Sequence, residues 1–132
     1  KDINRLEMVQ RKAVRFIYGV YNRHASVSEL LNKAQLSTLS TRNTINRLKL
    51  LFQIIHGMIN INRDKYISFS ARSNTRSQHP YYITEPLPRN NVFQYSFFPH
   101  TFKDWNNLPA EMTSSSSLIS FLDSVRKHFN VE

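Results

Sequence analysis

The chain has 132 residues, a length typical of one domain, and it contains no cysteine. The absence of cysteine excludes a disulfide scaffold, a Cys-ligated zinc site, an iron–sulfur cluster and a thiol nucleophile. Lys and Arg number 18 against 9 Asp and Glu, so the net charge is +9 and the pI is about 10.2. This surplus favours a polyanionic partner, with nucleic acid ahead of an anionic membrane surface.

Residues 2–20 are predicted to form an amphipathic helix, because apolar residues recur there at steps of three and four. These apolar residues are Ile3, Leu6, Val9, Ala13, Phe16, Ile17 and Val20. The basic residues Lys1, Arg5, Lys12 and Arg15 fall together on roughly the opposite face. Gly19 has a position suited to the end of this helix.

Two further helices are expected before residue 60. Ser26 and Glu29 have the spacing of a capping box, which predicts a short helix over 27–34. A long helix is predicted to begin at a cap formed by Ser37 or Ser40 and to end near Gly57. Its apolar stripe consists of Ile45, Leu48, Leu51, Phe52 and Ile55.

Residues 60–96 lack periodicity and are predicted to form a long irregular segment, with short strands at 81–84 and 92–95. Pro99 fits the first turn of a helix over 99–107 that carries aromatic residues. A last helix is predicted over 117–129, capped by Ser116 or Ser117. The large aromatic residues around Pro99 and Pro109 are expected to form a core plug that joins this last helix to the earlier ones.

These elements predict a mainly α fold, a small helical domain of four to five helices with a long irregular middle segment and a short hairpin. Residues 1–132 are expected to form this one domain. It divides into a basic helical half (1–59), an irregular basic loop (60–96), and an aromatic block with the terminal helix (97–132).

Most of the positive charge lies in residues 1–60, where ten Lys or Arg minus three Asp or Glu leaves +7. In residues 61–132, eight minus six leaves +2. A polyanion is therefore expected to contact the N-terminal half and the middle loop. The predicted nucleic-acid-binding residues are Lys1, Arg5, Arg11, Lys12, Arg15, Arg42, Lys49, Arg72 and Arg76.

Each basic cluster also has a plain alternative. A charged stripe on a helix is usually a solvated face, and only the charge surplus favours phosphate contacts. In the loop, Arg72 and Arg76 with Tyr81 and Tyr82 fit two descriptions equally well. One is a grip on single-stranded nucleic acid with bases stacked on the rings, and the other is a polar loop whose tyrosines dock on the core.

The sequence carries no pattern typical of a catalytic or cofactor site. All five histidines are more than twenty residues apart, and none has a ligand at helical spacing. The two glycines cannot build a phosphate-binding loop, and the acidic residues are scattered singly. We therefore expect no metal, no cofactor and no catalytic residue in this segment.

Location also follows from the sequence. No run of about eighteen apolar residues occurs, and no secretory signal follows Lys1. We expect an intracellular, nuclear location, and the start at Lys1 in place of Met indicates a piece of a longer protein.

Three stretches together carry a resemblance to a known family. They are LEMVQRKAVRFI (6–17), RLKLLFQIIHG (47–57) and YSFFPHTFKDWNNLP (95–109), followed by SLISF (117–121). This order resembles the C-terminal region of reverse transcriptases from non-LTR (LINE-type, jockey-like) retrotransposons. The resemblance covers nearly the whole chain, and the block with Ser-Phe-Phe-Pro and Trp-Asn-x-Leu-Pro is its most specific part.

The resemblance implies a parent protein with an endonuclease and an RNA-directed DNA polymerase, followed by this segment. The polymerase's paired-aspartate motif is not in the sequence, so no catalytic residue carries over. Without cysteine the chain also lacks the zinc knuckle of some such proteins. The implied role is electrostatic binding of RNA or DNA in support of target-primed reverse transcription, with the upstream polymerase domain as a further partner and no membrane.

The alternative is a structural or protein-interaction module. It would buttress the polymerase thumb and have no nucleic-acid affinity of its own.

Overall fold

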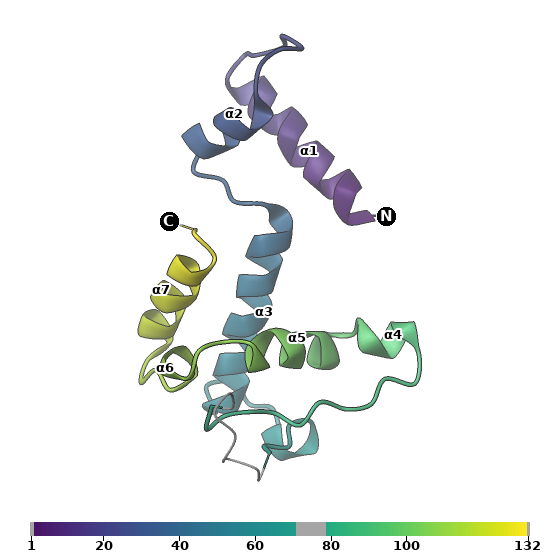
Figure 1. Cartoon of the computed structure of the whole chain (residues 1–132), viewed down its shortest axis with the longest axis vertical. Coiled ribbons are helices and arrows are strands. Elements are labelled where there is room, and N and C mark those ends of the chain that lie inside the picture. The colour runs from purple at the N-terminus through teal and green to yellow at the C-terminus, as the bar shows by residue number, and fades with distance from the viewer. Residues whose placement is uncertain (1, 71–78, 132) are drawn as a thin grey trace.

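The long helix α3 (Leu39–Ile55) is the element on which α1, α5 and α7 pack (Figure 1). The structure is a computed structural model and describes residues 2–70 and 79–131. The other elements of the described chain are α1 (Asp2–Ile17), α2 (Val27–Lys33), the 3-10 helix η1 (Arg63–Lys65), α4 (Asn91–Gln94), α5 (Phe97–Asn106), α6 (Ala110–Thr113) and α7 (Leu118–His128). The prediction of a mainly α fold is confirmed.

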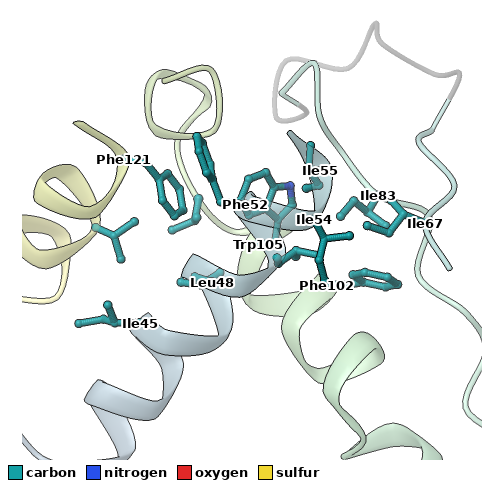
Figure 2. Packing of buried hydrophobic residues seen from close by; sticks show 13 residues of the cluster. Ile45, Leu48, Phe52, Ile54, Ile55, Ile67, Ile83, Phe102, Trp105 and Phe121 are labelled. Atoms are coloured by element: carbon teal, nitrogen blue, oxygen red, sulfur yellow. The ribbon is translucent and has the colours of Figure 1, made fainter. Parts of the chain in front are cut away.

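The core lies where α5 and α7 meet α3 (Figure 2). Its buried side chains are mostly Ile, Leu and Val, packed around the rings of Phe52, Phe102, Trp105 and Phe121. The ring of Phe52 on α3 stacks on Phe121 of α7, with the ring centres 4.4 Å apart. Trp105 of α5 is fully buried and lies 5.7 Å from the same Phe121 ring. All five residues of the predicted apolar stripe of α3 are buried, so this prediction is confirmed. Full burial of such an apolar side chain contributes roughly 1.5–3 kcal/mol, so the rings and the aliphatic stripe of α3 both stabilise the core.

The side chains of Trp105 and Asn106 fasten the irregular segment to the end of α5. The indole Nε1 of Trp105 donates to the carbonyl oxygen of Tyr81 at 2.9 Å. The amide of Asn106 accepts from the backbone N–H of Ile83 at 2.9 Å and donates to its carbonyl oxygen at 2.8 Å. A third bond runs from Asn106 Nδ2 to a carboxylate oxygen of Glu85 at 3.1 Å. Asn106 thus pairs with Ile83 as a neighbouring strand would.

The predicted hairpin between 81–84 and 92–95 is wrong. Ile83 instead makes an isolated antiparallel bridge with Phe69, supported by bonds from Ser70 N to Tyr82 O and from Thr84 N to Ser68 O, each 2.8 Å. Residues 92–95 belong to α4 and its C-terminal cap. The side chain of Asn90 accepts from the N–H of Phe93 at 2.8 Å, and this cap starts a helical turn that alternating polarity alone does not reveal.

Caps decide the ends of several helices. Ser26 caps α2 and Ser117 caps α7, as predicted. The cap of α3 is Thr38, whose hydroxyl accepts from Thr41 N at 3.1 Å, so the prediction of Ser37 or Ser40 is wrong by one or two residues. The backbone of Thr38 is extended, which is the conformation that an N-cap residue requires.

Helix α1 ends three residues before the predicted end, and α5 begins two residues before its predicted start. Gly19 follows α1 with φ of +63° and Gly57 follows α3 with φ of +67°. These left-handed values favour glycine and stop each helix.

His79 is buried at the end of α5, where it is 4% exposed. Its Nε2 lies 3.3 Å from the carbonyl oxygen of Trp105, which only accepts, so Nε2 is the protonated nitrogen. Its Nδ1 is buried without a hydrogen-bond partner in the described part of the chain. Burial lowers the pKa of His79 below 6.5, although the bond to Trp105 partly offsets this effect.

Replacing Asn106 with Leu is predicted to destabilise the fold strongly. The substitution leaves the buried N–H and carbonyl of Ile83 without partners, which costs roughly 2–4 kcal/mol of unfolding free energy. Urea denaturation measures the change. Asn107→Leu is the control, because Asn107 is exposed and its change is expected to stay within about 0.5 kcal/mol. Equal losses for both variants would contradict the account.

Stability is predicted to fall as pH drops below about 6.5, because His79 then gains a proton in the unfolded chain before it does in the folded chain. Denaturation at a series of pH values between 5 and 8, the range in which a histidine titrates, measures this slope. The His79→Gln variant should lose most of the slope, whereas His24→Gln, at an exposed position, should keep it. A slope that survives in His79→Gln would show that other groups cause it.

Candidate nucleic-acid interface

The predicted basic face of α1 is present and open to solvent. Arg5, Arg11 and Lys12 are exposed and Arg15 is half-buried. At about 100° per residue, these four side chains span a sector of about 120° around the helix axis. None of them forms an ion pair with another described residue, since the ion pairs found there involve other side chains. Their charges are therefore free to meet a polyanion.

α1 is held against the start of α3 by polar contacts, which set the direction of its basic face. A carboxylate oxygen of Glu7 accepts from the N–H of Ser40 at 3.1 Å, at the N-terminus of α3. Gln10 is buried, and its Nε2 donates to the carbonyl oxygen of Ser37 at 3.1 Å. Val14 is fully buried on the same side. Figure 1 shows α1 and α2 together at the N-terminal end of α3.

The apolar stripe that the sequence indicated for α1 is mostly uncovered. Phe16 is 75% exposed, Ile17 68%, Val9 63% and Leu6 56%. The helix instead buries the neighbouring face with Gln10 and Val14, because polar bonds from Glu7 and Gln10 dock it on α3. Positions 7, 10, 14 and 18 share one helix face, but they hold both polar and apolar residues. A search for periodic apolar residues therefore does not detect that face.

Arg42 and Lys49 lie on α3, apart from the basic face of α1 in sequence, and both are half-buried. Arg42 Nη2 donates to the amide oxygen of Gln10, so this guanidinium joins α3 to α1. Its Nε is buried without a partner among the described residues. Arg42 therefore has a structural contact that the sequence did not indicate, and this contact competes with a phosphate for its donors.

Arg47, the third basic residue of this region of α3, connects α3 to α5. Its Nη2 lies 2.7 Å from a carboxylate oxygen of Asp104, in an ion pair whose side chains are 24% and 29% exposed. Its Nη1 lies 3.1 Å from Nδ1 of His100. Since a guanidinium only donates, this His100 nitrogen is the acceptor and the imidazole is in its Nε2-protonated form. The network holds the two helices together.

The middle loop is described only in part. Lys1, Arg72 and Arg76 lie outside the described residues. Tyr81 packs against the core and its ring centre lies 5.9 Å from that of His56. Tyr82 is half-buried beside His79, with the ring centres 5.9 Å apart. Both tyrosines therefore dock on the protein, as in the plain alternative.

The described residues hold no group of three or more His, Asp or Glu side chains that converge as metal ligands would. Within the same residues, each helix is too short or too polar to cross a bilayer.

Comparisons with protein-family models, with curated proteins and with solved structures gave no match to this chain.

Proposed function

We propose that this chain is a non-catalytic nucleic-acid-binding segment, and that α1 supplies the contact. The observation that carries the proposal is the sector formed by Arg5, Arg11, Lys12 and Arg15, which is unpaired among the described residues. A helix of 16 residues is about 24 Å long, so its basic side chains reach several successive phosphates.

The contact that this surface favours is electrostatic and largely independent of base sequence. Lysine and arginine side chains on a helix exterior neutralise phosphates and release counterions. Phosphate contacts position a protein on nucleic acid but read no bases. A segment of this kind adds affinity for a strand whose sequence is selected elsewhere.

The order of the family-like stretches supports a second part of the proposal, the kind of protein to which this segment belongs. We propose that the segment is the C-terminal region of a non-LTR retrotransposon reverse transcriptase and holds RNA or DNA during target-primed reverse transcription in the nucleus. Support comes from the resemblance of residues 6–17, 47–57 and 95–109. In the most specific block, Trp105 and Asn106 bind the backbone of residues 81–85, which gives that block a structural role.

A second candidate function is protein interaction, in which the segment buttresses the polymerase domain. The observation that favours it is the exposed apolar stripe of α1, where Phe16 is 75% and Val9 63% exposed. Apolar residues in a continuous exposed stripe are typical of a surface that a partner covers.

A salt titration separates specific use of α1 from general basicity. Changing Arg5, Lys12 and Arg15 together to Gln is predicted to weaken binding to single-stranded RNA at least tenfold at low salt. The slope of log K against log salt should fall by about 2, since each lost phosphate contact removes about 0.7 on a single strand. Fluorescence anisotropy at several salt concentrations measures both values.

The matched control changes Lys103, Arg126 and Lys127 to Gln, which removes the same charge from exposed positions on α5 and α7. This control is expected to keep most of the salt slope. Equal losses for the two triple variants would mean that net charge, and not the face of α1, determines binding.

A further inference from the structure

The second exposed face of α1 is apolar and lies beside the basic one. Leu6, Val9, Ala13 and Phe16 are all exposed on it, so the described chain leaves this stripe without a cover. We propose that it is the docking site for an amphipathic helix of a partner protein, with acidic side chains along one edge. The inference rests on the protein-interaction candidate above, and it shares Arg5 and Lys12 with the proposed nucleic-acid contact.

The shape of the surface favours a rod-like occupant. Ile3 and Leu6, at the N-terminal end of the stripe, line a cleft of about 340 Å³. Leu39 of α3 and Tyr95 and His100 near the start of α5 form other parts of its wall. A helix laid along α1 can insert apolar side chains into this cleft. A flat bilayer cannot follow this concave surface.

The charges beside the stripe indicate the edge of the partner. Arg5 and Lys12 border the stripe on the side away from the cleft, and they are seven residues apart. Seven residues are two helical turns, or about 10.5 Å along the axis. Acidic residues at the same spacing on a partner helix would face both cations, as flanking charges do in paired helices.

A second copy of α1 does not match the charges beside the apolar stripe. An antiparallel pair of α1 helices brings like edges together, which places Arg5 and Lys12 of one copy against those of the other. Like charges so placed repel. A parallel pair directs the basic edge toward the side of α1 that α3 already covers through Gln10 and Val14. The arrangement therefore favours a different, acidic helix.

The apolar and nucleic-acid faces can be tested separately. Arg11 and Arg15 lie on the part of the basic sector farthest from the apolar stripe, at about 100° per residue. Substitutions at these two positions therefore affect phosphate contacts without touching the docking face. Neutral polar substitutions of Val9 and Phe16 change the docking face and leave the phosphate contacts in place.

The test uses a designed helical peptide as the probe. The peptide has Leu at alternating steps of three and four and two Glu seven residues apart along one edge, and its matched control has Lys at those two positions. Fluorescence anisotropy with the full chain measures binding. The Glu peptide is expected to bind at least tenfold more tightly than the Lys peptide, and Arg5→Glu with Lys12→Glu should reverse this preference.

Three variants locate the site. The double variant Val9→Ser with Phe16→Ser should bind the Glu peptide at least tenfold more weakly and bind RNA as before. Leu87→Ser with Ile119→Ser is the control, because these apolar residues are 90% and 75% exposed elsewhere, and it should bind the peptide normally. Arg11→Gln with Arg15→Gln should weaken RNA binding only.

Several results would overturn the proposal. Equal binding of the two peptides, or binding of neither, would exclude an acidic helix as the occupant. A dimer in analytical ultracentrifugation that Val9→Ser with Phe16→Ser dissociates would identify a second copy as the occupant. Co-sedimentation with phosphatidylserine vesicles that the same variant abolishes would identify a lipid surface.

Discussion

The fold depends on the bonds that the side chains of Trp105 and Asn106 make to the backbone of residues 81–85. An irregular segment has backbone donors and acceptors that burial would leave unpaired, at a cost of about 1–3 kcal/mol each. Asn106 supplies both partners of Ile83, so Ile83 can be fully buried in the core. Leu108 is then buried beside them, and Pro109 begins the turn into α6 that leads to α7. The block Trp-Asn-x-Leu-Pro therefore allows the irregular segment to pack against the core with its buried backbone groups hydrogen-bonded.

α1 contributes no residue to that core. α1 contacts α2 and α3, and its bonds to α3 run through Glu7 and Gln10. This mode of docking turns only one narrow side of the helix inward. The basic and apolar sectors both stay exposed, side by side, on a single helix. A helix with two such faces can contact a phosphate backbone and a protein at the same time, which suits a segment that keeps a nucleic acid close to another protein domain.

The sequence predicted what depends on local pattern. The period of the apolar residues identified the buried stripe of α3, and Ser26 and Ser117 marked helix starts, because capping is a short-range interaction. The sequence did not predict local structure that depends on a contact between residues far apart in the chain. No pattern near residue 83 indicates that its strand-like partner is the side chain of Asn106. For the interface, the basic sector of α1 was predicted, but the polar bond from Arg42 to Gln10 and the exposure of Phe16 follow only from how α1 docks on α3.

We propose that nucleic acid contacts the basic sector of α1, whereas the core around Trp105 and Phe121 has a structural role. Backbone amide chemical shifts, recorded by NMR during titration with single-stranded RNA at low salt, test this most directly. We expect the largest shifts to cluster on α1 around Arg5, Lys12 and Arg15, and the amides around Trp105 and Phe121 to remain unchanged. Shifts centred on α5 and α7, with α1 unaffected, would contradict it.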